Sequence, residues 1–183
     1  MTPVRLIGPG GAGKTTAGAA LANRLQARFG DLDAEFIARN GDIADFIGKR
    51  GYDAYAAENV QAYLALCDAP APYGVLALSS GFMTYRDGIH PAYTAIRRQI
   101  VSDARAFVLL PSLDLEACVS EIVRRQLQRP LPFVRTPERE ERVIRTRFAL
   151  YADLPVRKVV THRPVQTVVD EIAALLDPQA SVF

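Results

Sequence analysis

A glycine-rich segment near the start of the chain carries the residues best suited to binding phosphate. Residues 8–15 match the pattern G-x-x-x-x-G-K-[ST] in full. The glycines at positions 10, 11 and 13 let the backbone approach an anion closely, so that N–H groups of the loop and of the first helical turn point at the phosphates. The residues predicted to bind a nucleotide are Gly10, Gly11, Ala12, Gly13, Lys14, Thr15 and Thr16.

Two side chains of this segment suit the ligand directly. Lys14 can reach the β- and γ-phosphate oxygens, and the Thr15 hydroxyl can bind Mg²⁺. The context also fits, because an apolar run at residues 4–8 predicts a buried strand before the loop and residues 14–28 have the apolar spacing of a helix. A chance glycine-rich turn with an exposed lysine is the alternative, and the flanking elements argue against it. We therefore expect ATP and Mg²⁺ as ligands.

A pair of carboxylates, Asp31 and Asp33, follows the predicted helix. If the chain returns along a strand at residues 28–30, the pair reaches the carboxyl edge of a parallel sheet, where ligands bind. Side chains alternate along an extended segment, so both carboxylates would share one face. One could hold Mg²⁺ while the other orients an acceptor hydroxyl and takes its proton. The alternative is an ordinary acidic loop in which Asp33 caps the next helix.

The elements that must position these residues alternate between strand and helix. Buried strands are predicted at residues 4–8, 28–30, 74–80, 106–110 and 158–161, and helices at residues 14–28, 91–101, 113–128 and 164–176. Residues 34–66 are mostly helical in pattern, and residues 129–141 are rich in proline and arginine. This pattern predicts an α/β fold of three layers, with helices on both faces of a parallel sheet, in one domain spanning residues 1–183.

The composition of the 183 residues excludes several classes of protein. Hydrophobic residues make up 49% of the chain, which argues against disorder, and a net charge of +2 gives no case for a nucleic-acid binder. No apolar run approaches the roughly 20 residues of a membrane span, and a signal peptide is not evident. The two cysteines lie far apart, which argues against a disulfide framework or a zinc cluster. We expect a cytoplasmic protein that is a monomer or a weak homodimer.

The order of motifs resembles shikimate kinase, a family of small P-loop kinases in the nucleoside-monophosphate-kinase-like group. The likeness covers roughly residues 4 to 176. Its motifs are the phosphate loop, Asp31-Leu32-Asp33, a helical insertion, a glycine motif after the third strand, Arg129-Pro130-Leu131, and Arg147 followed by Leu150-Tyr151. The resemblance implies a P-loop fold, an acceptor-binding insertion at about residues 34–66 and a lid at about residues 129–141.

The resemblance also implies roles for single residues. Asp31 would help Thr15 to hold Mg²⁺, and Asp33 would bind substrate hydroxyls and act as base. Arg129 in the lid would contact ATP phosphates, and Arg147 would bind the acceptor's carboxylate. The predicted catalytic residues are Lys14, Asp33 and Arg129, and the predicted acceptor-binding residues are Asp33, Ser80, Gly81 and Arg147.

Three departures from the family pattern fall on the acceptor side. The family's Phe-Arg pair, whose arginine grips the substrate carboxylate, is Tyr-Ala at residues 55–56, and its three glycines are Ser-Ser-Gly at residues 79–81. Tyr52 replaces a glutamate. Because the second arginine is missing, we expect a kinase that phosphorylates a hydroxyl of a small molecule other than shikimate, including acids whose charged group faces Arg147.

Two alternatives stay open at this point. One is a genuine shikimate kinase with a rebuilt carboxylate clamp, for which Arg50 and Arg86 are the nearest candidate cations in the sequence. The other is a nucleotide-binding regulatory module without kinase activity. The intact carboxylate pair and Arg129 argue against the module.

Overall fold

A computed structural model describes residues 2–127 and 137–177 of the chain. Its strands are β1 (Val4–Ile7), β2 (Phe29–Asp31), β3 (Val75–Ala77), β4 (Ala106–Leu110) and β5 (Arg157–Val160). Its α-helices are α1 (Lys14–Arg24), α2 (Leu32–Asn40), α3 (Ile43–Arg50), α4 (Tyr52–Cys67), α5 (Tyr93–Ser102), α6 (Leu115–Leu127), α7 (Pro137–Ala152) and α8 (Val165–Leu176). A short 3₁₀ helix, η1 (Phe82–Thr84), follows β3.

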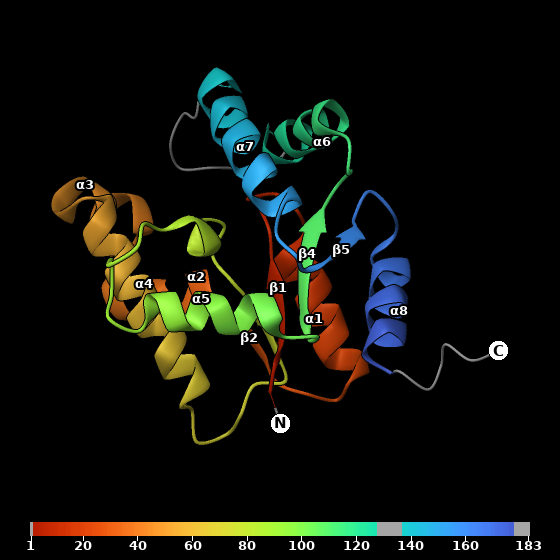
Figure 1. Cartoon of the computed structure of the whole chain (residues 1–183), viewed down its shortest axis with the longest axis horizontal. Helices are drawn as coiled ribbons and strands as arrows, with labels where there is room; N and C mark the ends of the chain where they lie inside the picture. Colours follow the sequence, from red (N-terminus) through yellow and green to blue (C-terminus); the bar gives the residue numbers. More distant parts are fainter. Residues whose placement is uncertain (1, 128–136, 178–183) are drawn as a thin grey trace.

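The strands form one parallel sheet in the order β2-β3-β1-β4-β5. Helices cover both faces of the sheet and bury every residue of β1 and β4, which are apolar except for Arg5. Helices α1 and α8 lie on one face, and α2, α4 and α5 lie on the other (Figure 1). The predicted three-layer α/β/α architecture is confirmed.

Two apolar clusters hold the layers together, one on each side of the sheet. The smaller joins β1 and β4 to α1 and α8 through side chains such as Leu21, Phe107 and Ile172, all fully buried. The larger joins the sheet to α2, α4, α5, α6 and α7, and contains Phe36, Tyr63 and Tyr93. The second cluster therefore fixes the helices that surround the carboxyl ends of β2 and β3.

The bounds of several elements differ from those predicted. Helix α1 ends at Arg24, because Gln26 takes a left-handed conformation (φ 51°) and the chain then turns into β2. The predicted helical segment at residues 34–66 is helical but divided, since the chain leaves α2 at Gly41 and α3 at Gly51, both with positive φ. Residues 129–136 of the predicted lid lie outside the described residues, and its last part, residues 137–141, is the start of α7.

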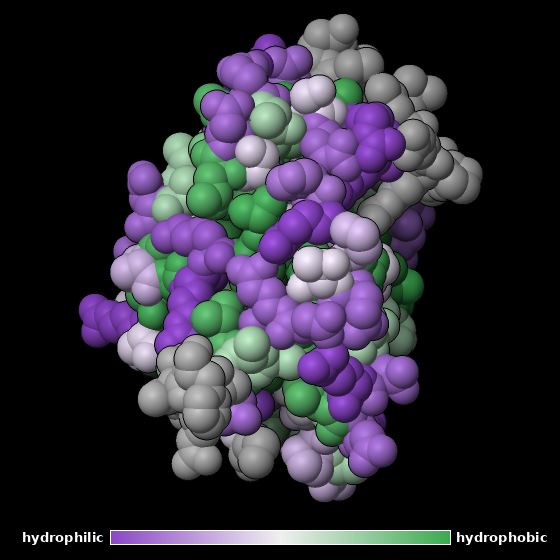
Figure 2. Space-filling view, turned by 90° about the vertical axis from the view of Figure 1, so that its right-hand side faces the viewer, coloured by the Kyte–Doolittle hydropathy of each residue, from purple (hydrophilic) through white to green (hydrophobic). Residues whose placement is uncertain are grey.

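The surface, the lengths of the helices and the two cysteines bear on the predictions made from composition. The face over α8 mixes hydrophilic residues with small hydrophobic areas (Figure 2). Within residues 2–127 and 137–177, no helix is both long enough and apolar enough to cross a bilayer. Cys67 is exposed, Cys118 is buried, and both are free thiols.

A buried arginine joins three elements of the fold. The Arg5 side chain on β1 is only 4% exposed and donates to the Asp103 carboxylate at 2.5 Å and to the Tyr63 hydroxyl at 2.8 Å. These bonds tie β1 to α4 and to the loop that precedes β4. A buried charge costs several kcal/mol when it loses its partner.

We expect Asp103→Ala to lower the free energy of unfolding by about 3 kcal/mol, because Arg5 would stay buried without its counter-charge. The matched control is Asp170→Ala, which removes the exposed Arg24–Asp170 pair and should cost less than about 1 kcal/mol. Urea unfolding followed by circular dichroism measures both. Equal losses in the two variants would contradict this account of Arg5.

Candidate functional site

The phosphate-binding loop joins β1 to α1, as its position in the sequence predicts. Gly8 has a φ of 143°, and a Cβ atom there would lie 2.3 Å from the carbonyl oxygen of Leu109, so the position excludes any side chain. The loop ends at Gly13, the N-cap of α1, in a left-handed conformation. The Lys14 ammonium is buried and donates to the carbonyl oxygens of Gly8 and Pro9 at 2.8 and 2.9 Å. The backbone N–H groups of the first turn of α1 have no helical acceptor, which makes this turn suited to an anion.

Asp31 stands where β2 meets α2. Its Oδ1 accepts the backbone N–H groups of Asp33 and Ala34, so Asp31 is the N-cap of α2, while its Oδ2 accepts the Thr15 hydroxyl at 2.7 Å. The prediction that Asp31 and Asp33 share one face of an extended segment is wrong, because the helix begins at Leu32. The alternative in which Asp33 caps the helix is wrong too. The tight turn nevertheless keeps both residues at the carboxyl edge of the sheet.

The Thr15–Asp31 pair is suited to Mg²⁺. Both donors are oxygen atoms, 2.7 Å apart, and Mg²⁺ in nucleotide-binding sites uses one or two protein carboxylates together with phosphate oxygens and water. Among the described residues no cluster of three or more His, Cys, Asp or Glu side chains could hold a metal alone. Two protein oxygens leave the other positions around the ion to phosphate oxygens and water, so the pair fits an ion that arrives with a nucleotide.

Asp33, in the first turn of α2, is held from the loop after β3. Its Oδ1 accepts the Ser79 hydroxyl at 2.5 Å. Burial raises the pKa of Asp33, whereas the Ser79 hydrogen bond and the charges of Lys14 and Arg147 act to lower it. Lys14 belongs to the phosphate loop and Arg147 to α7, so this carboxylate connects the phosphate side of the site to the acceptor side.

Arg147 reaches the loop after β3 from α7. Its Nη1 donates to the Ser80 hydroxyl at 2.9 Å, and the Tyr151 hydroxyl donates to the Ser80 carbonyl oxygen at 3.0 Å. A Cβ atom on Gly81 would lie 2.7 Å from the Tyr52 hydroxyl and 3.2 Å from Arg147 Nη2. A side chain at position 81 would therefore displace the Tyr52 hydroxyl, and the structure brings the predicted acceptor-binding residues together.

Aromatic residues line the position where the family pattern has its second arginine. Tyr52 and Tyr55 have ring centroids 5.7 Å apart, and Tyr52 and Tyr85 have theirs 6.0 Å apart. Desolvation raises the pKa of the Tyr55 hydroxyl to about 12, so it stays protonated near neutral pH. The neighbouring Ala56 is buried and supplies no charge.

The two candidate replacement cations point elsewhere. Arg86 donates two hydrogen bonds to the exposed Asp53 carboxylate, and the Arg50 guanidinium lies 5.4 Å from the ring centroid of Phe46. Both arginines are therefore engaged with other side chains, and the sequence-based suggestion that one of them rebuilds the clamp gains no support.

A cavity of about 350 Å³ opens between the phosphate loop, α6 and the start of α8. Its volume suits the base of a nucleotide. Its lining residues come from the loop, α1, α6 and the chain around the start of α8: Gly11, Gly13, Thr16, Ala17, Arg125, Thr161, Arg163, Val165 and Val168.

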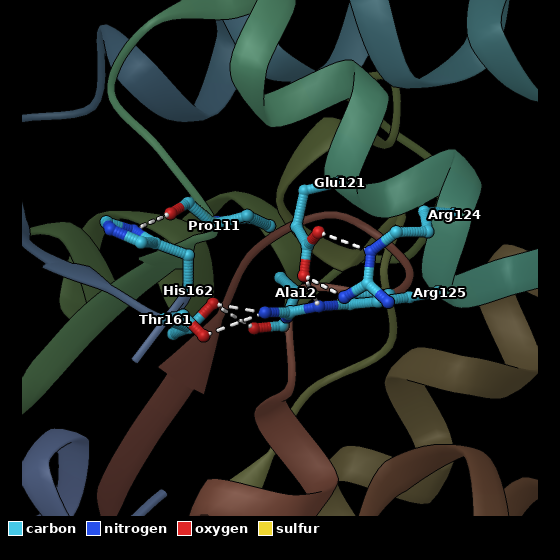
Figure 3. Close-up of polar contacts among 8 residues, drawn as sticks. Ala12, Pro111, Glu121, Arg124, Arg125, Thr161 and His162 are labelled. Carbon is cyan, nitrogen blue, oxygen red and sulfur yellow. Dashed lines mark hydrogen bonds and ion pairs between the residues drawn. The ribbon is translucent and has the colours of Figure 1, made fainter. Parts of the chain in front are cut away.

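A polar network from α6 and the end of β5 closes over the phosphate loop (Figure 3). The buried Thr161 hydroxyl donates to the Ala12 carbonyl oxygen at 2.8 Å. Arg125 donates to the carbonyl oxygens of Gly11 at 3.2 Å and Thr161 at 2.8 Å, and Glu121 holds Arg125 from the same helix. These bonds fix the middle of the loop against the carboxyl end of β5.

Sequence reasoning missed part of this arrangement. The only indication in the sequence that Thr161 contacts the phosphate loop is its position, as a polar residue at the carboxyl end of a predicted strand. The contact between Ser79 and Asp33 joins residues far apart in the chain and left no local pattern. Arg129 lies outside the described residues, so its predicted place in the site stays a prediction.

Comparison with known proteins identifies the group to which the chain belongs. A model of the family "Shikimate kinase" matches residues 10–177. The chain belongs to the shikimate kinase family. It is 35% identical over 177 residues to the shikimate kinase of Nitratidesulfovibrio vulgaris, a match that covers 94% of each chain. It is 32% identical over 184 residues to shikimate kinase 2 of Escherichia fergusonii, covering 97% of this chain and 93% of the relative.

Solved structures of shikimate kinases have the same fold. The enzyme from Acinetobacter baumannii, in complex with shikimate, superimposes with a TM-score of 0.71 at 23% identity, covering all of this chain and 96% of the other. Membership of the shikimate kinase family makes this protein an ATP-dependent small-molecule kinase that phosphorylates a hydroxyl group.

The Thr161 hydroxyl gives a test of how this kinase holds its phosphate loop. We expect Thr161→Val, which keeps the shape but removes the bond to Ala12, to weaken ATP binding about two- to tenfold, the equivalent of one neutral hydrogen bond. Thr161→Ser should bind ATP like the wild type. Titration calorimetry measures all three proteins, with Thr167→Val on the exposed part of α8 as control. Unchanged binding in Thr161→Val would contradict the predicted role.

Proposed function

We propose that this kinase transfers the γ-phosphoryl group of ATP to a hydroxyl of shikimate. The observation that carries the proposal is the position of Asp33 at the carboxyl edge of the sheet, where its Oδ1 accepts the hydroxyl of Ser79, the neighbour of the Ser80 that binds Arg147. A carboxylate so placed can face an acceptor hydroxyl on one side and the transferred phosphoryl group on the other. The relatives that match nearly the full length of this chain are named shikimate kinases, which favours shikimate over the different acceptor expected from the missing arginine.

The phosphate side of the proposed reaction rests on the loop and the carboxyl edge of the sheet. The loop amides and Lys14 bind the phosphates and neutralise their charge. Thr15 and Asp31 hold Mg²⁺, which offsets negative charge on the phosphate oxygens when it is bound. The cavity beside Arg125 and Val168 takes the base of the nucleotide.

On the acceptor side, Asp33 orients the hydroxyl and accepts its proton as the oxygen attacks the γ-phosphorus. Arg147 binds the acceptor's carboxylate, and the Tyr52 hydroxyl, which with Arg147 Nη2 lies over Gly81, supplies a second donor in a pocket that lacks the family's second arginine. Arg129 in the lid is proposed, from the family resemblance, to close over the phosphates and exclude water.

The organisation of the chain follows from the same proposal. Residues 1–183 form one catalytic domain, with residues 34–66 as the acceptor-binding insertion and residues 129–141 as the lid. We propose that the enzyme works as a monomer or weak homodimer in the cytoplasm.

A second acceptor class is favoured by one observation. Ala56 stands where the family pattern has an arginine, and its burial leaves no charge there for a carboxylate. A polyhydroxylated molecule with a weaker need for a carboxylate clamp would suit this pocket.

Measuring ADP release with ATP and Mg²⁺ over a panel of cyclic and linear hydroxy acids separates shikimate from this second acceptor class. Efficient turnover of shikimate supports the first proposal, whereas strong preference for another acceptor would replace it with the second.

Arg147→Ala should raise the KM for shikimate about 10- to 100-fold, because a charge-assisted hydrogen bond contributes about 1.5–3 kcal/mol. The KM for ATP should stay within about twofold of the wild type, since the phosphate loop is untouched. Arg142→Ala, an exposed arginine on the same helix, is the matched control. A KM for shikimate that does not move would rule out Arg147 as the carboxylate site.

Asp33→Asn should lower kcat by about 10²- to 10⁴-fold, the usual contribution of a general base. Asparagine keeps the shape of the side chain and can still accept a hydrogen bond from Ser79, so the KM for ATP should change little. Steady-state kinetics at saturating ATP measures both constants. A kcat within a few-fold of the wild type would show that Asp33 is not the base.

A further inference from the structure

Two adjacent serines hold the two charged side chains that face the acceptor pocket. The Ser79 hydroxyl donates to Asp33 Oδ1 at 2.5 Å, and the Ser80 hydroxyl accepts from Arg147 Nη1 at 2.9 Å. Asp33 lies on α2 and Arg147 on α7, elements that are far apart in the sequence. The loop after β3 therefore fixes the distance between the Asp33 carboxylate and the Arg147 guanidinium, although both groups belong to other elements.

The Ser79 hydroxyl has little freedom to turn. The residue is only 1% exposed, and it lies in the loop that packs beside the buried ring of Tyr85. The Tyr85 hydroxyl is itself held by Asn59 Oδ1 at 3.0 Å. Because an ionised carboxylate only accepts hydrogen bonds, the single hydrogen of Ser79 goes to Asp33. This hydrogen bond thus holds Asp33 Oδ1 and leaves Oδ2 for other partners.

The contact with Ser80 directs the other end of Arg147. With Nη1 on Ser80, Nη2 lies 3.2 Å from the point where a Cβ of Gly81 would stand, and the Tyr52 hydroxyl lies 2.7 Å from the same point. Two donors of different chemistry therefore converge over the bare backbone of Gly81. A carboxylate has two oxygen atoms and can accept from both donors at once.

Glycines at positions 79 and 80, as in the family pattern, could make neither contact, because they have no side chain. We propose that Ser79 and Ser80 are positioning residues for phosphoryl transfer. Ser79 holds Asp33 for the acceptor hydroxyl, and Ser80 turns Arg147 Nη2 towards Tyr52 to form a two-donor carboxylate site. The inference rests on the proposed acceptor chemistry and adds the groups that set its geometry.

The two serines should affect different kinetic constants. Ser79→Ala should lower kcat about tenfold, because Asp33 loses the hydrogen bond that orients it and favours its charged form, while the KM for ATP stays within about twofold. Ser80→Ala should raise the KM for shikimate about five- to tenfold with little change in kcat. Ser80→Thr keeps the hydroxyl at a half-buried position and should restore the wild-type KM. Ser102→Ala, at the exposed end of α5, is the control.

A second readout does not depend on the acceptor. The ¹⁵N relaxation of the Arg147 Nε–H group, assigned by its loss in Arg147→Lys, reports whether the side chain is held. We expect an ordered signal in the wild type and in Ser80→Thr, and a mobile one in Ser80→Ala. Thermal unfolding checks that each variant is folded. Ser79→Gly removes the whole side chain and so repeats the test of the Ser79 hydroxyl with the residue of the family pattern.

The outcomes separate this inference from the proposed function. If the wild type does not turn over shikimate, the acceptor is wrong, and the Arg147 relaxation still decides the role of Ser80. An Arg147 signal that is equally ordered in Ser80→Ala overturns that role. Kinetic constants of Ser79→Ala and Ser79→Gly that match the wild type, with any acceptor the enzyme uses, overturn the role of Ser79.

Discussion

The Asp33 carboxylate is the group on which the rest of the site depends. Its burial favours the neutral form, and the Ser79 hydroxyl, Lys14 and Arg147 favour the charged form. A base for an acceptor hydroxyl must be ionised, so the cations on both sides are part of its chemistry as well as part of substrate binding. The sheet order, the short β2 strand and the early start of α2 all serve to put this one carboxylate between the phosphate loop and α7.

The fold explains how such distant residues meet. All five strands are parallel, so their carboxyl ends share one edge, and the phosphate loop, Asp31, the Ser79–Gly81 loop and Thr161 all follow strands at that edge. Helices α2, α4 and α7 then close the acceptor side by packing on the larger apolar cluster. The nucleotide side is closed by α6, whose Arg125 reaches back to the loop.

The local parts of this arrangement could be predicted from the sequence, and the long-range parts could not. The phosphate loop can be predicted because one short pattern contains all the residues that it requires. The parallel sheet can be predicted because short, mostly apolar segments alternate with helical ones. The position of Asp31 as a helix cap was missed, since an extended segment and a helix start look alike over three residues. The contacts from Ser79 to Asp33 and from Ser80 to Arg147 depend on tertiary packing, for which a single sequence carries no signal.

Rebuilding of the acceptor pocket is the feature that separates this chain from the family pattern. An arginine is replaced by Ala56, while Tyr52 and two serines add hydroxyl groups around the remaining Arg147. The most direct test is a crystal structure of the enzyme with ADP, Mg²⁺ and shikimate. We predict a shikimate hydroxyl within hydrogen-bond distance of Asp33 and the carboxylate on Arg147 and Tyr52. Shikimate bound without either contact would contradict the account.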